Sequence, residues 1–417
     1  MGLSSSKQRR PPPPSPDVPP PRWSEIPPDL IGLILSRLLY HGDRLNLRAV
    51  CRQWRLAVRQ QNPHTLEWSL PWIRLRTTTD GDGFTFQSLP DGKLHRFRAA
   101  NVLDPSRPAL LRSSGDDGWL ELFNPGDTYY MCNTCSGAII RLPRVPARHC
   151  VKSAEVGGGG GGGETIPSWS IIRKVMVCSP GLIAAILYSN AVGLYRPGDT
   201  SWSVYPAPEC NDIAFYRGKL YSVTDDESLF AHELVNGSDE TVSHHVVEQV
   251  IKARNNHDER RRHFPRVLYL VASRDKLLMV VKWIVPRRAV SRSIRKNTAE
   301  GDGAIRLKVF EADLEMGRWM EVKNGLDGHA IFASRSCSKL VRLSGHDQRF
   351  QGDRVYFPGC ESPIYRTTVY TGDDSPSCRF YDMRKNTITK VFLNKGDAKY
   401  QQSYPEWFFP SPQKLCM

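Results

Sequence analysis

The 417-residue sequence lacks a long uninterrupted apolar run. The longest candidate, VMVCSPGLIAAILY, is broken by Ser-Pro-Gly and is well short of the roughly 20 residues that a membrane-spanning helix needs. The first 22 residues are Pro-rich and lack the apolar core of a secretion signal. We therefore expect a disordered leader over 1–22, no transmembrane helix and no secretion.

A regular cysteine framework is also missing, because the ten cysteines are scattered along the chain. In a long chain without a secretion signal, this favours reduced thiols inside the cell. Cys132 and Cys135 form a single C-x-x-C pair with His149–Cys150 downstream, whereas a structural zinc usually needs a second close pair. We expect two strand cysteines there and no metal.

Signatures of catalysis and nucleotide binding are weak. The run Gly157–Gly163 lacks the Lys-Ser/Thr that ends a phosphate-binding loop, so we expect a flexible loop. The paired acids Asp116–Asp117, Asp225–Asp226 and Asp373–Asp374 would suit a glycosidase only if they faced one another across a cleft. Each pair lies beside Gly, Thr or Ser, which favours residues that cap turns. We expect no enzymatic activity and no cofactor, and a propeller hydrolase is the third hypothesis.

What the sequence does contain, near its start, is helical periodicity. In DLIGLILSRLL, apolar residues repeat at helical spacing after the Pro27–Pro28 pair, which suits a first helical turn. Gly42 then predicts a stop, and Asp43 predicts the N-cap of a short helix that carries Leu45 and Leu47.

The next stretch, AVCRQWRLAVRQ, predicts one more helix. Val50, Trp54 and Ala57–Val58 share one face of it, while its arginines point elsewhere. Because about forty residues bury too little surface to be secure alone, we expect the apolar faces of these helices to meet another protein.

The stretch EIPPDLIGLILSRLLYHGDRLNLRAVCRQWRLAV resembles an F-box, with its Ile-Pro start, its Asp-x-Leu-x-Leu centre and its closing Val-Cys-Arg-x-Trp. The resemblance implies a helical domain over 23–62 that docks on a Skp-type adaptor, and through it on a cullin-RING ubiquitin ligase. The residues that it implies as adaptor-binding are Ile26, Pro27, Leu30, Ile31, Ile34, Leu35, Leu38, Val50, Cys51 and Trp54. The alternative role for several of them, Leu38 and Trp54 especially, is packing between the helices.

After position 64 the pattern changes to short β-branched or aromatic runs between Gly, Asp, Asn and Pro turns, which predicts an all-β domain over 64–417. LFNPGDT at Leu122–Thr128 recurs as LYRPGDT at Leu194–Thr200, with weaker echoes downstream. The recurring aromatics stand 72, 35, 80 and 70 residues apart, and they are Phe123, Tyr195, Phe230, Phe310 and Phe380.

These steps predict the arrangement of the strands. The short step fits a four-stranded blade, and the long steps contain insertions near 152–166 and 286–303. With one further blade at PWIRL, we expect a mainly β chain whose F-box precedes an approximately six-bladed β-propeller. PEWFFPSP should complete the blade that PWIRL begins, which would bury Trp407 and Phe408.

Five stretches are similar to the C-terminal domain of a large plant F-box family, named domain of unknown function 295 and often labelled kelch-like. They are FTFQSLPDGKLHRF, SSGDDGWLELFNPGDT, NDIAFYRGKLYSV, VFEADLEMGRWMEVKNGLDGHAIF and GDRVYFPG. This resemblance implies an architecture and a pathway but no ligand.

Charge and short motifs bear on location. The net charge is +14, from 57 Lys and Arg against 43 Asp and Glu. The basic stretches Glu259–Arg266 and 286–296 read as nuclear-import signals, as nucleic-acid patches or as solvated loops. MGLSSSK meets the pattern for N-myristoylation at Gly2, which alone gives only reversible membrane binding. We expect a nuclear or cytoplasmic protein, or one found in both places.

Our interpretation is a non-catalytic substrate receptor of an SCF-type (Skp-cullin-F-box) ubiquitin ligase. The F-box would bind the adaptor, the propeller would bind an unknown target protein, and no nucleic acid is expected. The alternative is a basic nuclear propeller protein that binds nucleic acid or acts as a regulator without a ligase role.

Overall fold

The computed structural model describes sixteen segments of the chain. They are residues 23–61, 69–75, 83–89, 92–98, 110–112, 118–124, 128–134, 136–145, 172–187, 191–236, 243–253, 266–285, 304–343, 350–358, 377–392 and 407–410. Several predicted features lie outside the described residues: the leader with Gly2, the insertions near 152–166 and 286–303, and the acid pairs at 116–117 and 373–374.

A helical unit opens the described chain. It contains a 3-10 turn η1 (Trp23–Glu25), α1 (Pro28–Arg37), α2 (His41–Ala49) and α3 (Arg52–Gln60). As predicted, α1 begins at the proline pair, where the missing N–H has no partner to lose.

The predicted start of the second helix was wrong. Tyr40, with extended backbone, is the N-cap of α2, so Gly42 and Asp43 lie inside its first turn and do not act as a stop and a cap. Asp43 suits this place for another reason, because its negative charge lies near the positive end of the helix dipole.

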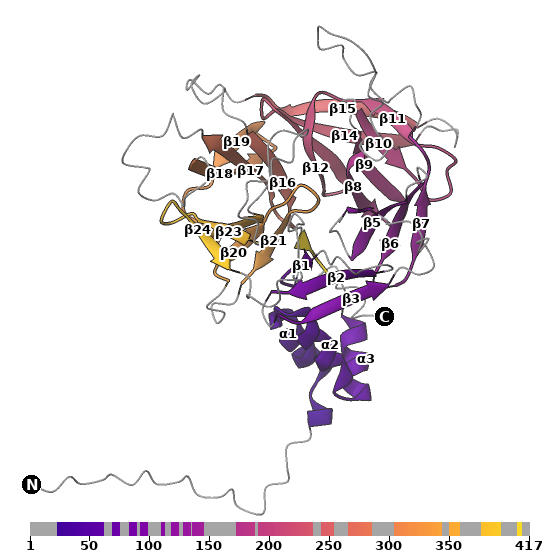
Figure 1. The fold of residues 1–417 in the computed structure, drawn as a ribbon, viewed down its shortest axis with the longest axis vertical. Coiled ribbons are helices and arrows are strands. Elements are labelled where there is room, and N and C mark those ends of the chain that lie inside the picture. The colour runs from indigo at the N-terminus through magenta and orange to yellow at the C-terminus, as the bar shows by residue number, and fades with distance from the viewer. Residues whose placement is uncertain are drawn as a thin grey trace, which may run out of the picture.

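The rest of the described chain forms six sheets that stand as blades around a ring (Figure 1). Blade 1 contains β1 (Trp72–Leu75), β2 (Gly83–Ser88), β3 (Leu94–Arg98) and β25 (Trp407–Phe408). Blade 2 contains β4 (Leu110–Arg112), β5 (Trp119–Asn124), β6 (Thr128–Asn133) and β7 (Ile139–Leu142). Blade 3 contains β8 (Ile172–Ser179), β9 (Leu182–Leu187), β10 (Ala191–Tyr195) and β11 (Ser203–Pro206).

The remaining blades follow in chain order. Blade 4 contains β12 (Cys210–Tyr216), β13 (Lys219–Thr224), β14 (Leu229–Asn236) and β15 (Ser243–Ile251). Blade 5 contains β16 (Arg266–Ala272), β17 (Leu277–Val285), β18 (Ala304–Asp313) and β19 (Arg318–Glu321). Blade 6 contains β20 (His329–Phe332), β21 (Lys339–Arg342), β22 (Arg354–Pro358), β23 (Ser377–Asp382) and β24 (Thr387–Phe392). The predicted six-bladed propeller is confirmed.

Local sequence explains the hairpins. β12 and β13 are joined by Arg217 and Gly218, whose φ angles are 48° and 79°. Two consecutive positive φ angles define the type I′ turn, whose twist matches that of the strands it joins. Glycine at the second position removes the side-chain clash that this backbone would otherwise impose.

Six clusters of buried apolar side chains fill the interfaces between consecutive blades. The last of these interfaces joins blade 6 to blade 1, where Phe332 and Tyr356 pack with Trp407 and Phe409. The ring is therefore closed by packing at each of its joints.

Blade 1 is also closed by hydrogen bonds between segments far apart in the chain. β25 pairs antiparallel with β1, with Trp72 opposite Phe408 and Ile73 opposite Trp407. Both Trp407 and Phe408 are buried. The predicted pairing of PEWFFPSP with PWIRL is confirmed.

Blade 6 departs from the four-stranded plan. Its order is β21-β20-β22-β23-β24, and β20 runs antiparallel to β21 but parallel to β22. The chain thus forms β20, turns back as β21 at one edge of the sheet, and returns as β22 on the other side of β20. Nothing in the sequence pattern predicted this fifth strand.

The aromatic markers identify blades but not equivalent strands. Tyr195, Phe230 and Phe310 lie in the third strands of blades 3, 4 and 5, whereas Phe123 lies in the second strand of blade 2. An aromatic strand followed by a polar turn fits any hairpin of a blade, so the repeat shifts by one strand between blades 2 and 3.

The helical unit joins the propeller beside blade 1 and lies outside the ring in Figure 1. Leu39 and Tyr40 pack against the cluster between blades 6 and 1, and the Leu70 N–H donates to the Leu39 carbonyl over 2.8 Å. The His41 ring meets the Trp72 indole edge-on, with centroids 5.7 Å apart. These contacts fix the unit on the propeller without placing it over the ring centre.

Candidate functional site

The three helices of the helical unit bury one shared apolar core. It consists of Ile31, Leu35, Leu47, Trp54, Ala57 and Val58, with Ile26, Leu38 and Cys51 partly buried against it. The predicted set therefore divides, and six of its ten residues lie in or against this core. Packing between the helices is the role that the structure gives to Trp54, Ile31 and Leu35.

The outer face of α1 carries other members of the predicted set. Leu30 is 49% exposed, Ile34 is 37% exposed and Pro27 is also exposed. Leu33 lies beside them and is 49% exposed, although sequence reasoning missed it. Its position three residues after Leu30, on a helix whose apolar residues extend beyond one narrow stripe, was the available signal.

The link between α2 and α3 adds a further exposed apolar side chain. Val50, which was expected on the buried face of α3, is 56% exposed and precedes the helix. Cys51 is the N-cap of α3, and its Sγ accepts from the Trp54 backbone N–H over 3.5 Å. The Trp54 indole N–H donates to the Trp23 carbonyl over 2.8 Å, which fastens η1 to α3.

Exposed large hydrophobic side chains concentrate on the helical unit. Of the twelve among the described residues, seven lie in this short segment: Trp23, Leu30, Leu33, Ile34, Leu45, Val50 and Leu56. A contiguous exposed apolar surface on a folded domain marks an interaction site. We name the surface formed by Leu30, Leu33 and Ile34 the α1 outer face.

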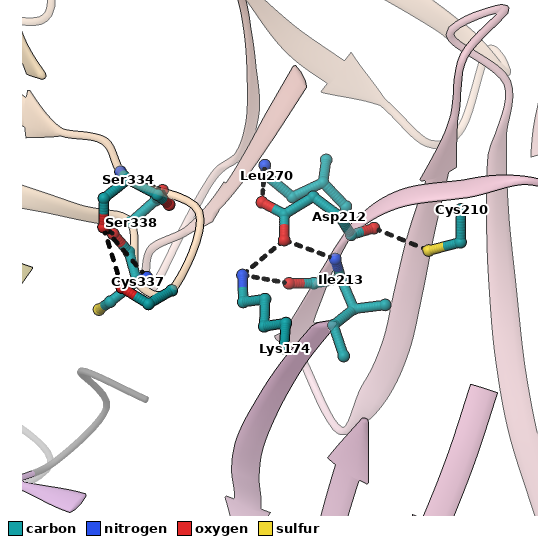
Figure 2. A network of polar contacts seen from close by, with 9 residues as sticks. Lys174, Cys210, Asp212, Ile213, Leu270, Ser334, Cys337 and Ser338 are labelled. Atoms are coloured by element: carbon teal, nitrogen blue, oxygen red, sulfur yellow. Dashed lines mark hydrogen bonds and ion pairs between the residues drawn. The ribbon is translucent and has the colours of Figure 1, made fainter. Parts of the chain in front are cut away.

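A buried network of polar contacts lies where the first strands of blades 3, 4 and 5 meet (Figure 2). The Lys174 ammonium on β8 lies 2.5 Å from Oδ1 of Asp212 on β12, and it also donates to the Ile213 carbonyl over 3.1 Å. Asp212 accepts from the backbone N–H groups of Ile213 and Leu270, each over 2.8 Å. One buried carboxylate thus ties three blades together.

The electrostatics of this group are those of a buried structural pair. Burial raises the pKa of Asp212, while the Lys174 charge and the two backbone donors oppose that shift. Burial also raises the pKa of the adjacent Cys210 thiol to about 12, so this thiol is protonated and a poor nucleophile. Arg173, whose pKa is lowered by burial and by the charge of Arg335, donates to the Cys210 carbonyl over 2.8 Å.

The turn between β20 and β21 lies across from this group in Figure 2. The Ser334 hydroxyl donates to the Cys337 carbonyl over 2.7 Å, and the Ser338 hydroxyl donates to the Ser334 carbonyl over 3.0 Å. The Trp407 indole N–H donates to the Ala333 carbonyl over 3.0 Å. The turn therefore fastens blade 6 to the closing strand β25.

The described acid pair has the predicted turn role. Asp226 accepts from the Thr224 hydroxyl and, over 3.1 Å each, from the backbone N–H and hydroxyl of Ser228. These hydrogen bonds outweigh burial and lower the pKa of Asp226. The described part of the chain holds no cluster of three or more His, Cys, Asp or Glu suited to a metal, and none of its helices is long and apolar enough to cross a membrane.

The fold and the helical unit together define a class: a small three-helix unit followed by a six-bladed β-propeller. Residues 23–62 match the F-box-like family model, and residues 86–392 match the KIB1-4 beta-propeller model. The second match covers most of the chain, so the protein belongs to the KIB1-4 beta-propeller family. The earlier resemblance to domain of unknown function 295, with its kelch-like label, is not what this match shows.

Related proteins are similar over only part of their length. The F-box protein SKIP23 of Arabidopsis thaliana is 24% identical over 227 residues, which cover 49% of this chain and 54% of that protein. A putative F-box protein of the same plant is 26% identical over 208 residues, which cover 48% and 56%. The chain thus matches about half the length of these relatives.

Among solved structures, the β-propeller domain of Cps50 (Swd1) from Myceliophteria thermophila is similar with a TM-score of 0.34 and 10% identity. The matched region covers 60% of this chain and 70% of the Cps50 chain. A similarity at this level carries no argument about function.

Proposed function

We propose that this protein is the substrate-recognition subunit of an SCF-type E3 ubiquitin ligase. The helical unit binds a Skp-type adaptor, and through it cullin, while the propeller holds a target protein. Ubiquitin transfer itself is carried out by other subunits. The proposal fits a protein of the nucleus, the cytoplasm or both.

The observation that carries the proposal is the α1 outer face. A helix whose apolar residues cover more than one narrow stripe normally buries them against more than one neighbour. Here Ile31 and Leu35 are buried by α3 and its neighbours, while the α1 outer face lies open in a segment that matches the F-box-like family. Covering this face with an adaptor would stabilise the complex by about 25 cal/mol for each square ångström of apolar surface that is removed from water.

The test compares two full-length variants that lose similar amounts of exposed apolar surface. Leu30→Ser, Leu33→Ser and Ile34→Ser together should reduce affinity for a plant Skp-type adaptor by about 100-fold or more, because centrally buried apolar contacts dominate small interfaces. The control variant carries Val246→Ser, Met316→Ser and Met320→Ser, which remove exposed apolar side chains of the propeller. It should bind the adaptor like the wild type.

Binding is measured by co-purification and by titration, with the thermal midpoint of each variant as the check on folding. Equal retention of the adaptor by the wild type and by the α1 variant would contradict the proposal. So would a wild-type protein that fails to bind the adaptor at all.

A further inference from the structure

α3 has a second surface that its own fold does not use. Arg52, Arg55 and Arg59 are all exposed. At 100° per residue they lie within about 60° of one another on the helix, away from the buried Trp54 and Val58. We name these three side chains the arginine row.

Arg52 opposes the dipole of its own helix, whereas Arg59 lies in the last turn of α3, where the dipole favours a positive charge. α1 and α2 each carry an acid in the first turn and an arginine in the last, as the helix dipole favours. α3 carries no acid in its first turn and begins instead with Arg52. The spacings of three, four and seven residues also bring like charges together on one face.

No group within the described residues offsets this charge, because no Asp or Glu there forms an ion pair with Arg52, Arg55 or Arg59. Over 23–61 the helical unit has six arginines against three acids. The exposed pairs of the propeller differ, since Lys219 and Arg318 each have a carboxylate partner. The row is thus a positively charged surface that the carboxylates of the described residues leave unpaired.

The position of the row indicates its partner. Arg52 follows the exposed Val50 by two residues, and α3 packs directly against α1. Leu56, which is also exposed, follows Arg55 directly. Exposed apolar side chains beside a row of guanidinium groups fit a protein surface that has an apolar part and an acidic part.

We propose that the arginine row docks on an acidic segment of the same adaptor that covers the α1 outer face. This inference rests on the proposed function and adds the chemistry of the partner. Charges at the edge of an interface steer encounter and fix orientation, so the row chiefly raises the association rate.

The experiment uses the full chain with Arg52→Glu, Arg55→Glu and Arg59→Glu. The association rate constant for a plant Skp-type adaptor should fall about tenfold or more at low ionic strength, and its salt dependence should flatten or reverse. The thermal midpoint should change little, because the acid that Arg52→Glu places in the first turn of α3 is favoured by the helix dipole, while the acid that Arg59→Glu places in the last turn is opposed by it. Stopped-flow mixing over a range of salt concentrations measures the association rate constant and its salt dependence.

The matched control carries Arg141→Glu, Arg306→Glu and Arg342→Glu, three exposed arginines on three different blades. It makes the same change in net charge on the propeller instead of on the helical unit, and its association rate should stay near that of the wild type. An arginine-row variant that associates at the wild-type rate would overturn the inference.

Two further outcomes are decisive. If the row variant binds normally while the α1 variant does not, the inference is wrong and the proposed function stands. If the row variant keeps its adaptor kinetics but loses salt-sensitive retention on duplex DNA, the row is a nucleic-acid contact and the inference is also overturned.

Discussion

The helical unit and the propeller place their large hydrophobic side chains differently. The propeller holds six buried clusters, one at each joint between blades, while the helical unit buries one small core and leaves seven large hydrophobic residues exposed. The propeller is complete in itself because its last joint closes on its first blade. The helical unit instead leaves the α1 outer face open, which is the surface where we propose that the adaptor binds.

The largest expected effect tests whether the propeller is complete only as a ring. Deleting residues 400–417 removes β25, and with it Trp407 and Phe408 from the joints on both sides of blade 1. We expect loss of cooperative unfolding and aggregation through the open edge of β1. Light scattering and thermal unfolding check this, and a truncated protein that stays monomeric with an unchanged midpoint would contradict it.

The next largest expected effect concerns the buried ion pair between Lys174 and Asp212, which joins blades 3, 4 and 5. Lys174→Met leaves the Asp212 carboxylate buried without its cation, which should cost about 3–5 kcal/mol of unfolding free energy. The control is Lys219→Met, which breaks an exposed pair with Glu233 and should cost at most about 1 kcal/mol. Urea unfolding measures both, and equal losses would show that the Lys174 pair is not structural.

A sharper comparison lies within α1 itself. Leu35→Ala removes a fully buried side chain and should cost about 2–5 kcal/mol, whereas Leu33→Ala on the outer face should change stability by about 0.5 kcal/mol or less. Hydrogen-exchange protection of the α1 amides gives the local readout. Equal effects at the two positions would mean that the outer face is covered within the chain.

The smallest effect concerns pH and blade 6. Burial alone would raise the pKa of Asp353, but the Leu326 N–H and the Arg384 guanidinium bind its carboxylate and hold the pKa below its usual value. A lowered folded pKa stabilises the fold above the unfolded value, and that stability is lost as pH falls through the folded pKa. Asp353→Asn should cost about 1–3 kcal/mol at neutral pH.

The difference between wild type and Asp353→Asn should shrink as pH falls below about 4. Asparagine also tolerates the left-handed backbone at this position, where φ is 61°, so strain does not confound the comparison. Urea midpoints at neutral and acid pH measure the effect, and a difference independent of pH would rule out the carboxylate as its source.

Much of the architecture could be predicted from local patterns. Runs such as KLLMVVKWIV and AIRLKVF are β-branched and aromatic enough to specify strands, and PWIRL with PEWFF has the composition of two buried strands in need of partners. The helical spacing around Trp54 likewise specified α3. Each of these signals lies within a few residues, where sequence and conformation are directly linked.

The features that escaped prediction depend on contacts between distant segments. The Asp212 carboxylate meets Lys174 and the Leu270 N–H, which lie 38 and 58 residues away, and no periodicity records such pairing. The parallel strand β20 likewise depends on its neighbours in blade 6. On α1, the periodicity predicted an apolar helix, but only the packing of α3 decides which of its apolar residues are buried and which stay exposed.

The pairing of Ile73 with Trp407 also has a consequence for the order of folding. These residues lie roughly 330 positions apart, so their contact closes one of the longest loops in the protein, and such contacts form late because chain entropy opposes them. Blades 2 to 5 are built from successive hairpins and can form beforehand. The helical unit is equally local in sequence. We therefore expect a folding intermediate that already presents the α1 outer face while its ring is still open.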